Sequence, residues 1–330
     1  MIRSGAIVQP TSPLGQEDKP KGLVARLRSG DQVARMIVLL AAGAIFLITA
    51  IIFSELVLES KLSRHQFGWR FLVTSTWDPV MGDFGALPFI YGTLVTSALA
   101  LLMAVPLGVA SAIFLSELAP RRLSDALTFL IELLAAVPSV LYGLLGIFVL
   151  VPFLQDHLVP PLQSLLGSLP IFSGAFYGVS YFSAGVVLSI MVVPFIVSVS
   201  REVLLAVPRE QREASFALGA SRWQTTRRVV WPNAARGIFG SVFLALARAL
   251  GETMAVTMVI GNATRISTSI LAPGYSIAAI IANEFTEATG DLYLSALIEL
   301  GLVLFAVTFV VNGLARLLIV ATIRRGHSAA

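Results

Sequence analysis

Two charged residues, Arg248 and Glu252, lie in an apolar stretch that runs from Gly237 to Ile260. A charge at the centre of a bilayer costs about 3 kcal/mol on insertion scales, so a membrane helix keeps one for a reason. Arginine presents five donors in a planar fork that matches a tetrahedral oxyanion in bidentate fashion. A carboxylate four residues further on would share the helix face and could accept a hydrogen bond from a protonated anion. The pair predicts an oxyanion site on a path through the membrane.

A structural ion pair is the other interpretation of these two residues, because neighbours at i and i+4 can neutralise each other. Base before acid is the weaker order for such a pair, which favours the anion site. Phosphate carries a proton near neutral pH and sulfate does not, so a buried carboxylate acceptor would favour phosphate. Ala247, Gly251 and Ala255 add a row of small residues that predicts close packing of this helix.

A second motif lies in a charged segment, residues 201–236. Glu213-Ala214-Ser215 is followed after three residues by Gly219, and after nine more by Val229-Val230-Trp231-Pro232. This spacing resembles the EAA loop of ABC importer permeases, although Ser215, Val229 and Trp231 depart from the residues usual in that family. The resemblance implies that Glu213, Ala214 and Gly219 couple the chain to a separate cytoplasmic ATPase. A solvated basic linker is the alternative.

The residues of this loop also predict its local structure. Pro208 suits the first turn of a helix, and Gly219 suits its C-terminus, where a left-handed residue is needed. Ser221 is a suitable N-cap for a second helix, which Pro232 is expected to break before the next span. The pattern therefore predicts two short helices joined at a glycine, with an apolar stripe that a groove on a partner could bind.

Three further passages resemble phosphate-specific ABC importer permeases of the PstC type: Ala247–Val256 with Ile260-Gly261-Asn262, Val137–Gly143, and Ile281–Phe285. The resemblance implies a type I importer permease (MetI-like) fold of six transmembrane helices. It implies four kinds of partner: a second, homologous permease chain, a dimeric cytoplasmic ATPase, an extracytoplasmic phosphate-binding protein, and phosphate itself. It also implies that Arg248 and Glu252 matter for phosphate passage.

The composition is that of an integral membrane protein. The 330 residues are 56% hydrophobic and 13% charged, with a mean hydropathy of +0.86, whereas a soluble domain is about 25% charged. Because hydrocarbon offers backbone amides no partner, we expect an all-α protein surrounded by lipid. Six segments reach the roughly 20 apolar residues that a span needs: Met36–Leu58, Tyr91–Leu115, Leu127–Leu150, Tyr181–Ser200, Gly237–Ile260 and Leu294–Val320.

The predicted organisation has three parts. Residues 1–35 form a cytoplasmic tail with a possible interfacial amphipathic helix, residues 36–58 form the first span, and residues 90–323 form a permease core that contains the 201–236 loop. With the N-terminus inside, 18 Lys and Arg residues lie inside and four outside. The positive-inside rule then places both termini and the loop in the cytoplasm of a multi-pass protein of the inner (plasma) membrane.

Other chemistry finds little support in the sequence. There is no cysteine, the three histidines lack metal-ligand spacing, and no Gly-x-x-x-x-Gly-Lys-Ser/Thr loop occurs. We therefore expect no catalytic residue, no metal site, no cofactor and no nucleic-acid partner; ATP and magnesium would bind to the ATPase. A permease for sulfate, molybdate or a phosphonate, a transporter driven by an ion gradient and an intramembrane enzyme remain as alternatives. Glu132 and Glu299 also lie in predicted spans, with no assigned partner.

Overall fold

The computed structural model describes residues 30–327, with the side chains of residues 32–317. The tail at residues 1–29, and with it most of the predicted interfacial helix, lies outside the described residues. The chain divides into two compact units, residues 1–55 and 56–330. One long apolar helix, α2 (Gly30–Glu59), makes up the described part of the first unit. The boundary between the units falls within this helix, so its residues from Leu56 onward belong to the second unit.

Six helices in the described ranges are long and apolar enough to cross a membrane, as the composition predicts. Residues 30–327 form an all-α fold apart from one short hairpin, which confirms the predicted class. The six candidate spans are Gln32–Glu59, Leu87–Leu118, Ser139–Leu166, Tyr181–Leu205, Arg222–Leu250 and Asp291–Leu317.

The second unit contains the remaining elements. From its start to the third span they are α3 (Lys61–Phe67), α4 (Arg70–Val73), β1 (Trp77–Asp78), β2 (Asp83–Phe84), α5 (Leu87–Ile113), the π-helical turn η1 (Phe114–Leu118) and α6 (Arg121–Ala135). The third span and its extension are α7 (Ser139–Leu145), η2 (Gly146–Leu150), α8 (Val151–Phe153), η3 (Leu154–Leu158), α9 (Val159–Leu166) and the short η4 (Pro170–Phe172). The rest are α10 (Tyr181–Leu205), α11 (Arg209–Ala217), α12 (Arg222–Thr225), η5 (Thr226–Val230), α13 (Trp231–Leu250), α14 (Met254–Val259), α15 (Ile277–Glu284) and α16 (Asp291–His327).

The third span differs from the predicted segment, Leu127–Leu150. Helix α6 ends at Ala135 and α7 begins after Pro138, because proline disfavours helical geometry in the residue before it and cannot donate a backbone hydrogen bond. α6 is too short to count among the six candidate spans, and Glu132 on it is exposed. The expectation that Glu132 lies within a span is therefore wrong.

The fifth span also differs, since Pro232 does not break the helix that precedes it. α12, η5 and α13 form one continuous helix from Arg222 to Leu250. Pro232 lies in the first turn of α13, directly after the π-helical turn η5. Because π-turns and prolines both loosen the regular ladder of hydrogen bonds, a proline here is tolerated without ending the helix.

α5 and α10 form the centre of the second unit, and α10 is the most buried of the six spans. They meet where glycine lets two backbones approach each other. A Cβ added to Gly108 would lie 2.8 Å from Cγ2 of Ile196, and one added to Gly185 would lie 2.8 Å from Cβ of Leu99. Close packing of this kind holds membrane helices together where lipid removes the hydrophobic drive.

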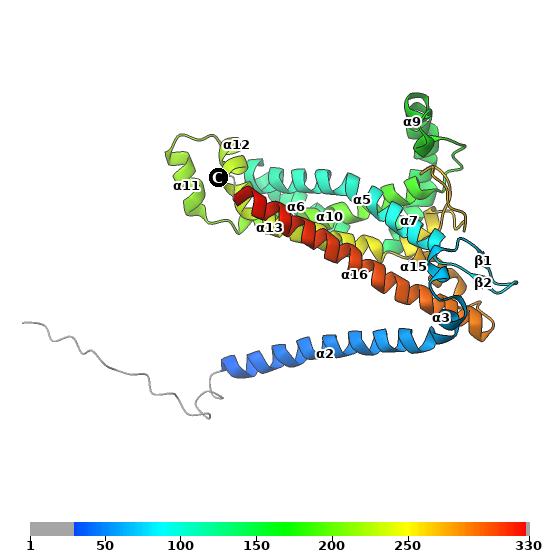
Figure 1. The fold of residues 1–330 in the computed structure, drawn as a ribbon. Coiled ribbons are helices and arrows are strands. Elements are labelled where there is room, and N and C mark those ends of the chain that lie inside the picture. The colour runs from blue at the N-terminus through cyan, green and yellow to red at the C-terminus, as the bar shows by residue number, and fades with distance from the viewer. Residues whose placement is uncertain (1–29, 328–330) are drawn as a thin grey trace, which may run out of the picture. The chain divides into compact units, whose positions relative to one another are not determined.

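The two ends of the second unit carry different elements (Figure 1). α11 and α12 lie at one end, together with the C-terminal end of α16, and α15 and the β1–β2 hairpin lie at the other. The hairpin is antiparallel, with Trp77 opposite Phe84. Its aromatic residues join Phe71, Phe89 and Ile277 in a buried cluster that closes this end of the unit.

Candidate functional site

Arg248 lies in the last turn of α13, and Glu252 lies beyond the end of that helix. α13 ends at Leu250, Gly251 is its C-cap, and α14 begins only at Met254. The predicted continuous span to Ile260 is therefore wrong, and the two charged residues do not share a helix face. Glycine is a poor helix former, so Gly251 is a favourable place for the interruption.

The row of small residues is interrupted at the same point. Ala255 lies on α14 and is fully buried, whereas Ala247 and Gly251 are exposed. The close approach involves α7: a Cβ added to Gly143 would lie 3.2 Å from Cα of Ala255 and 2.5 Å from Sδ of Met258. After the break in the fifth span, α14 packs closely on α7 at Gly143, where a larger residue would require Met258 and the Ala255 backbone to shift.

The Arg248 guanidinium is exposed on this chain. The ion pairs between described residues are Arg201–Glu202 and Arg212–Glu117, so Arg248 and Glu252 do not neutralise each other. Arg248 lies at the C-terminal end of a helix, where the helix dipole favours a cation. On α7, the Tyr142 hydroxyl donates to the Leu134 carbonyl oxygen at 2.7 Å.

Glu252 has a partner in the backbone. Its Oε1 accepts a hydrogen bond from the backbone N–H of Ala255 at 3.2 Å, in the first turn of α14. A carboxylate in that place satisfies an otherwise unpaired donor at the helix start. Two passages that are far apart in the sequence, residues 137–143 and 247–256, come together where α14 packs on α7.

The loop between the fourth and fifth spans has the predicted elbow. α11 ends before Gly219, whose φ of +83° is the left-handed conformation that glycine adopts without strain. Ser221 then caps α12: its hydroxyl accepts from the N–H of Gln224, and the Gln224 side chain accepts from the N–H of Ser221. This reciprocal capping box fixes where the second helix begins.

The outer surface of the loop combines polar and apolar side chains. Glu213 and Ala214 are exposed, and so are Leu218 (90% exposed) and Trp223 (57% exposed). Within the loop, the Ser215 and Thr225 hydroxyls lie 3.0 Å apart, and the Asn233 amide donates to Oε1 of Gln211 at 2.9 Å. The two helices are thus braced against each other, with apolar groups left on the outside.

One strong interaction of the loop was not predicted from the sequence. Arg212 of α11 forms an ion pair with Glu117 of η1, with 2.8 Å between Nη2 and Oε1. The two residues are 95 positions apart in the sequence, and no local signal pairs them. The residues around Arg212 predicted a coupling loop, but they did not predict which membrane helix the loop contacts.

A second unpredicted cluster lies at the opposite end of the unit. Oε2 of Glu284 accepts from the Trp77 indole N–H at 2.8 Å and from the Tyr293 hydroxyl at 2.6 Å. Burial raises the pKa of the neighbouring Tyr275 hydroxyl. The hydrogen bond that this hydroxyl accepts from Asn283 lowers the pKa by a smaller amount. One carboxylate therefore joins the hairpin, α15 and α16.

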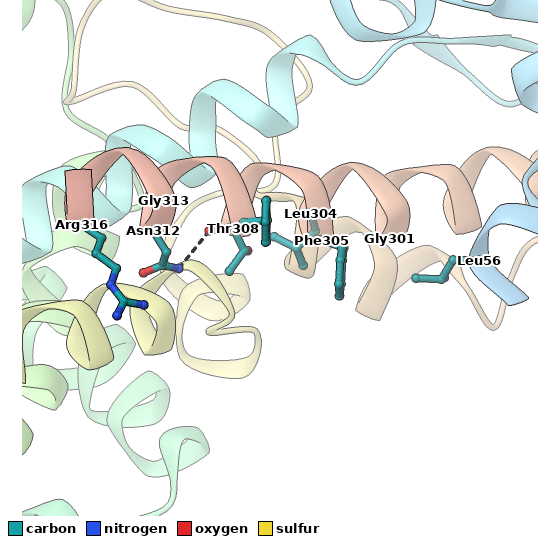
Figure 2. A pocket seen from close by; sticks show the side chains of 9 residues that line it. Leu56, Gly301, Leu304, Phe305, Thr308, Asn312, Gly313 and Arg316 are labelled. Atoms are coloured by element: carbon teal, nitrogen blue, oxygen red, sulfur yellow. Dashed lines mark hydrogen bonds between the residues drawn. The ribbon is translucent and has the colours of Figure 1, made fainter. Parts of the chain in front are cut away.

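Several open hollows lie along α16, and two of them are relevant here. The first, of ≈ 710 Å³, has mostly apolar walls, and its lining includes neither Arg248 nor Glu252. Figure 2 shows Arg316 and Asn312 at one end and Leu56 at the other, with the Asn312 amide donating to the Thr308 carbonyl oxygen. The second contains Glu299 next to Arg64, and one oxygen of the Glu299 carboxylate has no hydrogen-bond partner among the described residues. The linings of both hollows are mostly apolar, and neither includes Arg248 or Glu252.

Residues 104–323 match the family described as binding-protein-dependent transport system inner membrane component, so the chain belongs to that family of membrane subunits. The crystal structure of a bacterial alginate ABC transporter, in complex with an alginate pentasaccharide-bound periplasmic protein, has the same fold. Its TM-score is 0.56 at 18% identity, covering 87% of this chain and 96% of that one. The chain therefore has the predicted fold of an ABC importer permease.

The sequence relatives are more specific. The chain is 51% identical over 254 residues to a protein of Mesorhizobium japonicum, covering 76% of this chain and 78% of the relative. It is 48% identical over 284 residues to a protein of Haemophilus influenzae, covering 85% and 90%. Both relatives are named phosphate transport system permease protein PstC.

Proposed function

We propose that this chain is the permease subunit through which an ATP-driven importer moves inorganic phosphate into the cytoplasm. The observation that carries the proposal is the 51% identity to a phosphate transport permease over three quarters of the chain. A different substrate would require different polar groups along the transport path. The passage around Arg248 is part of the resemblance to phosphate permeases that predicted phosphate as the substrate.

Arg248 is proposed to bind the passing phosphate. A guanidinium exposed on a spanning helix cannot be left against lipid, because a charge there costs several kcal/mol. It must face a water-filled path or a neighbouring subunit, and the second permease chain would complete the path at this face. Glu252 is proposed to contribute indirectly, because its contact with the N–H of Ala255 holds the start of α14 next to Arg248.

The loop between α10 and α13 is proposed to contact the cytoplasmic ATPase. Glu213, Ala214 and the Gly219 elbow would form the contact, with Leu218 and Trp223 entering a groove on the partner. ATP and magnesium would bind to the ATPase dimer, and this chain would carry no cofactor. The loop and both termini would lie in the cytoplasm, and the hairpin end would face the phosphate-binding protein outside.

The test is uptake of phosphate by vesicles that contain this chain with the second permease, the ATPase and the binding protein. We expect uptake to require ATP and the binding protein, and to be unaffected by excess sulfate, molybdate or phosphonate. Inhibition of phosphate uptake by one of these oxyanions would show that the proposed substrate specificity is wrong. Uptake that persists without the ATPase would show that the transporter class is wrong.

A further inference from the structure

The Arg212 guanidinium connects three structural elements at the loop end of the unit. It forms the ion pair with Glu117 of η1, and its Nε also donates to the second carboxylate oxygen at 3.4 Å. It donates to the backbone carbonyl of Leu204, in the last turn of α10, at 2.7 Å, and to that of Val207, just beyond the end of this helix. α11 is therefore bound through one side chain to the ends of both α5–η1 and α10.

This ion pair is well shielded from water. The side chains of Arg212 and Glu117 are only 16% and 10% exposed, whereas Glu202 in the nearby pair with Arg201 is 72% exposed. Removing one partner of a buried pair leaves an uncompensated charge and is therefore costly, whereas an exposed pair contributes little. The Arg212–Glu117 ion pair is thus hard to break, whereas the Arg201–Glu202 ion pair is not.

The two helices that Arg212 reaches are the central packed pair. At Gly108–Ile196 and Gly185–Leu99, α5 and α10 pack so closely that an added Cβ would lie 2.8 Å from the opposite side chain, and we expect such a pair to move together. The far end of α5 is bound in turn: the Tyr91 hydroxyl donates to the Ser267 carbonyl oxygen at 2.9 Å. A displacement applied to α11 would therefore move α5, α10 and the segment at the opposite end.

We infer that Arg212 and Glu117 are positioning residues that transmit the movement of α11 to the α5–α10 pair. The inference rests on the proposed function, because it requires an ATPase that moves α11. The bidentate fork resists rotation as well as separation, which a single-point contact through lysine would not. Removing this ion pair should leave ATP hydrolysis intact and reduce the phosphate transport that hydrolysis drives.

The experiment measures both rates in the reconstituted complex, together with co-purification of the ATPase. Glu117→Gln keeps the size of the side chain and removes its charge. We expect normal assembly, continued ATP hydrolysis, and about a tenfold fall in phosphate imported per ATP, as for loss of about 1.4 kcal/mol of coupling. Glu202→Gln, the matched change in the exposed pair, should leave this ratio unchanged.

A second variant separates transmission from simple folding. The chain has no cysteine, so Arg212→Cys with Glu117→Cys introduces the only two thiols of this subunit. The uncross-linked variant should show the low ratio, a reducible bis-thiol cross-linker should restore it about threefold or more, and reduction should abolish the gain. Wild-type complex treated in the same way is the control.

Two results would overturn the inference. One is a wild-type ratio of import to hydrolysis in Glu117→Gln; the other is a cross-link that restores assembly but not the ratio. Failure of the proposed function looks different, because then the wild-type complex itself shows no ATP-dependent phosphate uptake.

Discussion

Arg248 and Glu252 are four residues apart, yet a helix end lies between them. α13 ends at Leu250, and the Glu252 carboxylate binds the N–H of Ala255 in the next helix. The Arg248 guanidinium has no hydrogen-bond acceptor or ion-pair partner among the described residues. Glu252 instead stabilises the start of α14 through its hydrogen bond with Ala255.

The first prediction concerns Arg248. Arg248→Lys keeps the charge but replaces the fork with a single point charge, so phosphate loses part of its hydrogen bonding. Hydrogen bonds to charged groups contribute about 1.5–3 kcal/mol, so uptake should fall about ten- to hundredfold. Transport by reconstituted vesicles measures this, with co-purification of the ATPase unchanged.

Arg265→Lys is the control for that change, because Arg265 is also exposed and lies outside the six candidate spans. It should transport as the wild type does. If Arg248→Lys matches the wild type too, Arg248 does not bind the transported anion.

The second prediction concerns the elbow. Gly219 has φ +83°, and an added Cβ would meet nothing within 4 Å, so a substitution there acts through the backbone alone. Valine in the left-handed region costs about 1–2 kcal/mol or more. Gly219→Val should weaken ATPase binding about tenfold, as measured by titration of the ATPase onto the detergent-solubilised permease pair.

Asparagine adopts the left-handed conformation more readily than other side chains, which makes Gly219→Asn the matched control. It should bind the ATPase nearly as well as the wild type. Equal weakening by both substitutions would contradict a backbone effect.

The third prediction concerns the contact between α5 and the segment before α15. A Cβ on Gly92 would lie 2.0 Å from the Tyr275 carbonyl oxygen, a backbone atom that cannot rotate away. Gly92→Ala should destabilise the protein by about 1–3 kcal/mol, in the range of overpacked cores. Thermal unfolding of the purified subunit would show this loss.

Gly313→Ala serves as its comparison, because an added Cβ at Gly313 meets nothing within 4 Å. Its unfolding temperature should equal or exceed that of the wild type, since alanine is the better helix former. A stable Gly92→Ala would show that α5 and residue 275 do not approach as described.

The fourth prediction concerns the three-element contact at Glu284. One oxygen of this carboxylate accepts from both Trp77 and Tyr293. Glu284→Gln removes the charge from both bonds and should cost about 1–3 kcal/mol. Faster amide hydrogen exchange in the β1–β2 hairpin would report the loss.

Glu287→Gln, in the same segment but exposed, should leave that exchange rate unchanged. Equal exchange in the two variants would mean that Glu284 does not hold the hairpin.

Much of this architecture follows from local sequence properties. Six apolar stretches yield six candidate spans because the need to satisfy backbone hydrogen bonds in lipid leaves a helix as the solution. Gly219 and Ser221 define the elbow because a left-handed residue and a helix cap depend on single residues and their neighbours. The position of Arg248 in a span was likewise predicted from composition alone.

The tertiary structure decided where helices stop and which charges meet. Pro138 separates two helices, whereas Pro232 does not. A π-helical turn directly precedes Pro232, and the helix continues there although proline lacks a backbone N–H to donate. The α13 helix ends at Leu250 where α14 turns to pack on Gly143, a contact more than 100 residues away in the sequence. Arg212 finds Glu117, and Trp77 finds Glu284, through the same long-range packing. Composition and local preference therefore set the helices and the elbow, whereas close approach between distant segments set the partners of Arg212 and Glu284.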